Sequence, residues 1–254
     1  MSYKINTGLS GDLFSLAISR SYQSLMTHME RLSSGLRINR ASDDPAGLVI
    51  SETLRGRIAS LRQEIDNTSQ MIRKYETAEG TVGQLQSMVN DLRAQAVGAA
   101  NTGVNSKEIT EAYQEAADQA VTTFNHIVGS ASYNGKPLFG PEGVAAIETL
   151  PGLDFSSPEA IQESMKSIEK AAAELGLAAG RIGAEEKYQL QAKRSNLEIT
   201  VGNLTAAESQ IRDADMALEM VGRVRDEMTL RVSLALLSHS YVSSRSVLSL
   251  LKSR

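Results

Sequence analysis

The feature that most constrains this chain is an apolar stripe that continues from Leu54 to Ala96 in steps of three and four residues. Such steps place side chains along one face of an α-helix. At about 1.5 Å per residue, a continuous helix of this length would rise about 63 Å. Only the region around Thr68 interrupts the phase of the stripe. Because helices of globular proteins are usually far shorter, the pattern predicts a rod or coiled coil.

Heptad spacing also marks both ends of the chain. Alternating steps of three and four residues favour a helix that lies along other helices. The two ends could therefore pair as an antiparallel two-helix coiled coil. We predict that they form a core and assembly interface through the side chains of Ile18, Tyr22, Leu25, Met29, Leu32, Leu234, Leu237, Tyr241, Leu248 and Leu251.

The stability expected of such a terminal pair is low. Two isolated helices bury little apolar area, so they are only marginally stable in water. We therefore expect both ends to be poorly ordered in the isolated chain and to fold when subunits pack together.

The middle of the chain interrupts the helical pattern most strongly. Residues 129–157 are rich in proline and contain Asn134-Gly135 between short apolar runs, a pair that favours a two-residue hairpin turn. Ser157 is a candidate N-cap of the next helix, with Pro158 in its first position. A last long helix is expected to carry Leu190 through Leu218 without a break.

The fold class predicted from these segments is all-α. We expect an elongated antiparallel helical bundle or coiled coil with a small β-hairpin in the middle of the chain. Residues 1–44 and 220–254 would form the paired terminal helices with an N-terminal connector. Residues 45–219 would form a helical rod domain, with a hairpin and loop at residues 129–157.

Composition excludes several classes of function. The formal net charge is −4 and no dense basic cluster is present, which argues against a nucleic-acid partner. The absence of cysteine excludes disulfides and thiolate chemistry. No apolar run reaches the roughly 18 residues that span a bilayer, so we expect no membrane insertion. The first residues do not resemble a secretory signal peptide.

Candidate catalytic and metal-binding residues are weak. His28, His126 and His239 lie far apart in the sequence, which disfavours a metal site. Asp213 and Asp215, two residues apart on a predicted helix, would point to different faces and not form a catalytic pair. We therefore expect no catalytic residues, no metal and no cofactor, and we do not expect an enzyme.

The sequence between the first two predicted helices contains residues typical of helix ends. Asp43-Asp44 before Pro45 is typical of a helix N-cap, where a carboxylate accepts hydrogen bonds from free N–H groups. Ser33-Ser34-Gly35 indicates a helix break.

Motifs at both ends resemble those of bacterial flagellins. Near the start, Arg31-Leu32-Ser33-Ser34-Gly35 is followed by Asp43-Asp44, and near the end stands Arg212-Asp213-Ala214-Asp215. The resemblance implies a structural subunit that polymerises with copies of itself into the flagellar filament. Its terminal helices would line the inner core, its longer helices would form the next shell, and outer variable domains would be missing.

The resemblance also implies a route and partners. A flagellin leaves the cell through the flagellar type III apparatus without a cleaved signal and ends in the extracellular flagellum. Its expected partners are an export chaperone and the filament cap and junction proteins. At Asn90, Asp91 and Leu92, the chain lacks the arginine of the family segment that animal innate receptors read. This departure argues against strong recognition by those receptors.

Two other functions compete with the filament subunit. A hook–filament junction protein is a flagellin relative of similar length, but the full Arg212-Asp213-Ala214-Asp215 motif favours flagellin. A soluble coiled-coil adaptor would form a stable monomer or small oligomer and no fibres.

Overall fold

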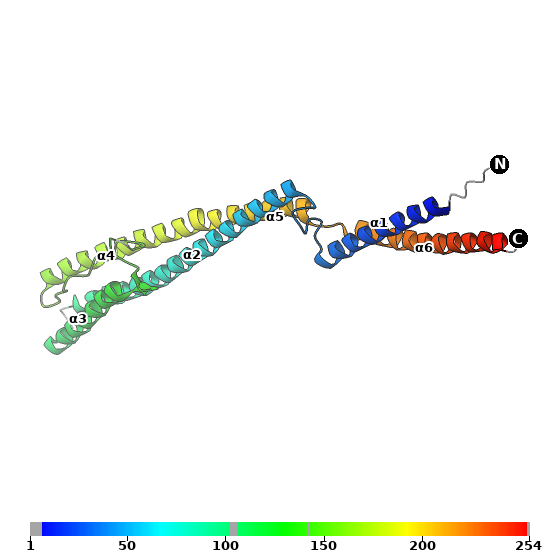
Figure 1. The fold of residues 1–254 in the computed structure, drawn as a ribbon. Helices are drawn as coiled ribbons and strands as arrows, with labels where there is room; N and C mark the ends of the chain where they lie inside the picture. The colour runs from blue at the N-terminus through cyan, green and yellow to red at the C-terminus, as the bar shows by residue number, and fades with distance from the viewer. Residues whose placement is uncertain (1–6, 102–105, 142, 253–254) are drawn as a thin grey trace. The chain divides into compact units, whose positions relative to one another are not determined.

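The computed structural model describes residues 7–101, 106–141 and 143–252, and side chains within residues 12–101, 106–141 and 143–242. Nearly all of this part of the chain is helical (Figure 1). The elements in chain order are α1 (Thr7–Ser34), α2 (Pro45–Ala99), α3 (Lys107–Ser130), β1 (Ser132–Tyr133), β2 (Lys136–Pro137), α4 (Pro158–Ala184), the π-helix η1 (Glu185–Leu190), α5 (Gln191–Arg212) and α6 (Met216–Lys252). The predicted helical class with a small mid-chain hairpin is confirmed.

The chain divides into two compact units. One unit contains Met1–Ala59 and Val201–Arg254, and the other contains Ser60–Thr200. The boundaries between the units, after residues 59 and 200, fall inside α2 and α5. The boundaries predicted from the sequence lie after residues 44 and 219. The assignment of residues 1–44 and 220–254 to an inner filament domain stays a prediction.

The stripe on α2 is continuous through the position where the sequence suggested a slip. Thr68 is 2% exposed and occupies the register between Leu61 and Ile72, both of which are buried. Its hydroxyl donates a hydrogen bond to the carbonyl of Glu64, 2.8 Å away. A threonine can hold this position because its polar group is satisfied within the helix.

The core of the second unit lies between α2, α3, α4 and the loop that follows the hairpin. Leu85, Phe124, Phe155 and Leu175, one from each of these segments, are completely buried within it. The apolar faces of three helices therefore meet, as the period of 3 and 4 predicts.

Two amide side chains on α3 attach this loop to the helices. The Gln114 side chain donates to the carbonyl of Leu153 and accepts from the N–H of Phe155, both at 2.7 Å. The Asn125 side chain bonds the N–H and carbonyl of Leu150 in the same way, at 2.8 and 2.9 Å. The loop is thus held without regular secondary structure, because the amides give partners to the backbone groups of Leu150, Leu153 and Phe155.

The predicted turn and cap in this region are confirmed. Asn134 and Gly135 both have positive φ, 52° and 75°, as a type I′ hairpin turn requires. Ser157 accepts a hydrogen bond at 3.2 Å from the N–H of Ala160, and Pro158 is the first helical residue.

The prediction of an unbroken helix from Leu190 to Leu218 is wrong. Helix α5 ends at Arg212 and α6 begins at Met216. Asp215 is the reason, because its side chain accepts hydrogen bonds from the N–H groups of Ala217 and Leu218 at 2.9 and 3.1 Å. Asp213 and Asp215 therefore do not share a helix, and Asp215 is an N-cap.

Candidate assembly interface

Helices α1 and α6 lie side by side and antiparallel in the first unit, and the end of α6 extends beyond the start of α1 (Figure 1). This terminal pair is the element that the sequence predicted as the assembly interface. Within the described residues, no helix has the length and apolarity needed to cross a bilayer.

The side chains between α1 and α6 are smaller and more polar than the sequence predicted. Ser21 and Ser233, at 9% and 6% exposure, are buried there. On α1 the partly or fully buried positions include one row in heptad order, Ile18, Ser21, Leu25, His28 and Leu32, flanked by others such as Phe14, Ala17, Ser24 and Arg31. The steps of three and four are those of a heptad, but serine and histidine occupy positions assigned to Tyr22 and Met29.

The predicted interface residues consequently separate into two groups. Ile18, Leu25, Leu32 and Leu237 are partly buried. Large apolar side chains are instead exposed at Tyr22, Met29, Leu234 and Tyr241, by 55%, 48%, 49% and 67%. The side chains of Leu248 and Leu251 lie outside the described residues. The role of this set in assembly stays a prediction.

A polar cluster between the two helices is the main feature that sequence reasoning missed. Glu219 on α6 is 6% exposed and accepts hydrogen bonds from His28 and, at 3.1 Å, from Arg31. Nε2 of His28 also lies 3.5 Å from Oδ2 of Asp226. Spacing within each helix does hint at the cluster, since Glu219 and Asp226 are seven residues apart, but the contact with His28 depends on how α1 meets α6.

The charge state of Glu219 follows from these contacts. Burial is the largest single effect and raises the pKa of its carboxyl group, while the hydrogen bonds and charge interactions with His28 and Arg31 together lower it by more. The net result is a pKa below the ordinary value of 4.5. Glu219 is therefore a buried anion paired with cationic or hydrogen-bonding neighbours.

The two family-like motifs meet in space next to this pair. Gly35, with φ of 73°, ends α1, and its carbonyl accepts a hydrogen bond from the N–H of Ala214 at 2.9 Å. Leu36 and Asp213 form an antiparallel bridge, and the N–H of Arg37 donates to the carbonyl of Arg212 at 2.6 Å. Backbone hydrogen bonds to residues 212–214 thus stabilise the start of the connector, residues 35–44, between α1 and α2.

The acidic residues of the first motif shape the entry into α2. Asp43 accepts hydrogen bonds from the N–H groups of Arg40 and Asn39 at 2.9 and 3.0 Å, which hold the pKa of its carboxyl group below the usual value. Asp44 accepts from the N–H of Gly47 at 2.8 Å, so its predicted role as N-cap is confirmed.

Glycine is required at position 47 by space. A Cβ atom there would lie 2.4 Å from a carboxylate oxygen of Asp44 and 2.8 Å from Cδ1 of the buried Ile38. Of the other motif residues, Ser34 accepts a hydrogen bond from the N–H of Leu36 at 3.1 Å. Ser33 is exposed.

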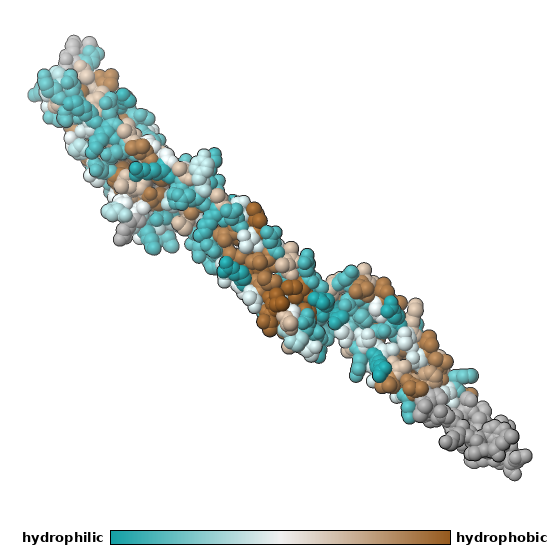
Figure 2. Space-filling model, turned by 90° about the horizontal axis from the view of Figure 1, so that it is seen from above, coloured by the Kyte–Doolittle hydropathy of each residue, from teal (hydrophilic) through white to brown (hydrophobic). Residues whose placement is uncertain are grey.

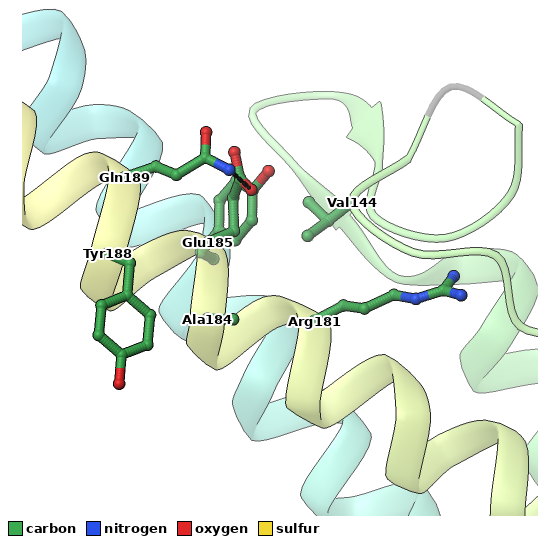
Figure 3. Close-up of a pocket in the computed structure, with 7 residues that line it drawn as sticks. Val144, Arg181, Ala184, Glu185, Tyr188 and Gln189 are labelled. Carbon is green, nitrogen blue, oxygen red and sulfur yellow. Dashed lines mark hydrogen bonds between the residues drawn. The ribbon is translucent and has the colours of Figure 1, made fainter.

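An open hollow of about 460 Å³ lies beside the π-helix in the second unit (Figure 3). Val144 points into it from the loop, Glu185 and Gln189 are hydrogen-bonded to each other at its edge, and Tyr188 also lines it. These groups do not form a nucleophile with a base. In the described part of the chain, no cluster of three metal-ligating side chains occurs.

The receptor-like positions lie on α2 in this unit. Asn90 and Asp91 are exposed, whereas Leu92 is completely buried in the core. Two of the three side chains are therefore available at the surface.

Comparison with protein families shows to which family the chain belongs. Residues 5–142 match the bacterial flagellin N-terminal helical region, and residues 159–251 match the bacterial flagellin C-terminal helical region. The chain belongs to the bacterial flagellin family. Only residues 143–158 lie between the two matched regions of this flagellin, which is consistent with a short form without variable domains.

Curated relatives of this flagellin cover almost its whole length. A flagellin of Halalkalibacterium halodurans is 32% identical over 88% of this chain and 90% of its own. Flagellin FlaB2 of Treponema pallidum is 30% identical, and the flagellar filament 33 kDa core protein of Treponema phagedenis 28%, each over 98% of this chain and 99% of its own. Flagellins are structural subunits of the bacterial flagellar filament and not enzymes. This chain is likewise a structural subunit.

Proposed function

We propose that copies of this chain assemble into the filament through the outward apolar faces of α1 and α6. The observation that supports this proposal is the exposure of large apolar side chains on both helices of the terminal pair, Tyr22 and Tyr241 among them. Figure 2 shows hydrophobic residues at the surface here, between hydrophilic ones. Clusters of exposed large apolar side chains are typical of protein–protein contacts.

A second copy of the chain is the occupant that fits these faces. Every copy carries the same exposed side chains, and a contact that repeats from subunit to subunit without closing builds a helical polymer. Burying a fully exposed side chain of this size contributes about 1.5–3 kcal/mol, and these side chains are about half exposed. Several of them per subunit would therefore add to the stability that the helix pair alone leaves marginal.

Seeded polymerisation of purified chain tests the interface. We expect Tyr22→Gln and Leu234→Gln to slow growth strongly, because each puts a polar group into a contact between subunits. Leu177→Gln is the matched control, since Leu177 is a 64% exposed leucine of the other unit. Removing residues 1–32 or 234–254 should abolish assembly. Normal growth of both apolar-to-polar variants would contradict the proposed interface.

The route and partners proposed for the chain rest on its family. It would pass through the flagellar type III apparatus unfolded, with the help of an export chaperone, and join the filament beyond the junction proteins and below the cap. Comparing culture medium from cells with and without the export apparatus tests this route. Equal release from both would contradict it.

A further inference from the structure

The imidazole of His28 fills a space that Gly222 leaves on α6. A Cβ atom at position 222 would lie 2.5 Å from Cε1 and 2.7 Å from Nε2 of the ring. Contacts below 3.0 Å do not occur between such atoms, so the ring would have to move. It is not free to move, because Nδ1 bonds to Glu219 and Nε2 faces Asp226 at 3.5 Å.

The surrounding charges disfavour a slide of one helix along the other by one turn. Glu219, Gly222 and Asp226 follow one another along the face of α6 that meets α1. A slide of one turn in either direction would bring Glu219 or Asp226 level with His28, where there is room only for a hydrogen atom. The same slide would take Glu219 away from Arg31, to which it is bonded at 3.1 Å. A buried carboxylate without its partners costs much more than one that keeps them.

We propose that His28 and Gly222 are the specificity determinants of the terminal pair. Together they set the register of α1 on α6, and they restrict this α1 to an α6 that has glycine at this position and a carboxylate one turn before it. Polar residues at single seam positions fix register in coiled coils in the same way. The inference concerns the helix pair of the proposed function, but it holds whether or not the chain polymerises.

The two helices offer a reporter of the register. Ser21 precedes His28 by seven residues and Thr229 follows Gly222 by seven, so two turns along each antiparallel helix lead from the contact of His28 with Gly222 to Ser21 and Thr229. The chain has no cysteine, so Ser21→Cys with Thr229→Cys creates its only pair of thiols. A disulfide requires Cα atoms about 4.4–6.8 Å apart, which makes it sensitive to a slide of one turn.

The experiment measures the rate of intrachain disulfide formation in dilute full-length chain, in which a disulfide traps the marginally stable helix pair whenever it forms. We expect cross-linking in the parent and a rate about tenfold lower with Gly222→Ala, the fold-change for overpacking by one methyl group. His28→Ala with Gly222→Ala should restore most of the rate, because the ring that collides with the methyl group is gone. Gly202→Ala is the matched control, since nothing lies within 4 Å of a Cβ atom there.

Three results of this experiment would overturn the inference. It fails if the parent does not cross-link, if Gly222→Ala behaves like Gly202→Ala, or if the double variant is no faster than Gly222→Ala. Cysteines at positions 21 and 236, offset by two turns from the expected register, should not cross-link, and equal rates for both pairs would show that no register is fixed. Polymerisation is not part of the readout, so a failure here is distinct from a failure of the proposed interface.

Discussion

Nη1 of Arg212, at the end of α5, lies 2.7 Å from Oε1 of Glu52 in the first turns of α2. Arg212 is only 14% exposed, and its contact holds the pKa of the Glu52 carboxyl group below the ordinary value. The backbone carbonyl of the same arginine accepts the hydrogen bond from Arg37. The C-terminal motif therefore stabilises the entry into α2, as well as its own turn.

Replacing Arg212 by glutamine should loosen this connector. We expect the melting temperature of the first unit to fall because the ion pair with Glu52 is lost. The fall should be only a few degrees, because Glu52 is half-exposed and solvent screens the pair. Arg93→Gln is the matched control, since Arg93 and its partner Glu169 are both more than half-exposed. Equal losses for the two variants would contradict a special role for Arg212.

The two aspartate caps should each contribute measurably. Asp44→Ala and Asp215→Ala remove side chains that accept hydrogen bonds from free N–H groups at the starts of α2 and α6, and each should cost about 1 kcal/mol in urea unfolding. Asparagine at either position should retain most of the stability because it also caps. Asp91→Ala, on an exposed face within α2, should cost nothing. An alanine variant at a cap as stable as the parent would show that the cap is dispensable.

Substitutions in the receptor-like segment, residues 90–92, should have different effects at its buried and its exposed positions. Leu92→Ala should destabilise the second unit by about 2–5 kcal/mol, because Leu92 is fully buried. Any loss of receptor response in this variant would therefore follow unfolding. Asn90→Arg restores the family arginine at an exposed position, and we expect it to raise receptor activation in a reporter-cell assay without changing stability. An unchanged response would sink the proposal that the missing arginine weakens recognition.

Apolar periodicity predicted the helices well but not which face of the terminal helices would pair. Thr68 and the core of α2 follow the expected stripe because one buried face dominates that helix. On α1 and α6 two faces compete, and Ser21 and His28 lie between the helices while Tyr22 and Met29 are exposed. Periodicity shows where apolar side chains lie, but not whether they meet the same chain or another copy.

The motifs were predicted with unequal success for a similar reason. The cap at Asp44 and the turn at Asn134-Gly135 depend on residues close in sequence, so local rules suffice. The break at Asp215 has the same local chemistry, but the continuing apolar pattern concealed it. The cluster of His28 with Glu219 joins residues from opposite ends of the chain, and no spacing rule brings them together.

Acid should weaken the terminal pair through Glu219. The pKa of its carboxyl group is lower in the folded chain than in the unfolded one, so below about pH 4.5 the unfolded chain binds protons first. The stability from Glu219 is therefore complete above that pH and is lost as the pH falls through the lowered pKa. The groups that face Glu219 are His28 and Arg31 on α1, with Asp226 on its own helix beyond His28.

The measurement for this effect is the helical content of α1 and α6 in assembled chain, titrated from pH 7 to about pH 3. Glu219→Gln should be less stable than the parent at neutral pH and should change less on acidification. Identical acid profiles for parent and variant would assign the pH dependence to other carboxyl groups.

Hydrogen exchange on the monomer tests the expected marginal stability of the ends. Backbone amides from Ile18 to Leu32 and from Leu234 to Leu251 should exchange rapidly, whereas those around Leu85 should be strongly protected by the buried core of α2. The protection of both ends should rise after polymerisation. Strong protection of the ends in the monomer would show that the pair folds without other copies.

The central claim is that the outward apolar faces of α1 and α6 join copies of this chain into a filament. Negative-stain electron microscopy of purified chain after seeding tests it most directly, with Tyr22→Gln and Leu177→Gln alongside. We predict long filaments of uniform width for the parent and for Leu177→Gln, and few or none for Tyr22→Gln. A parent chain that stays monodisperse, or a Tyr22→Gln variant that grows normal filaments, would contradict the claim.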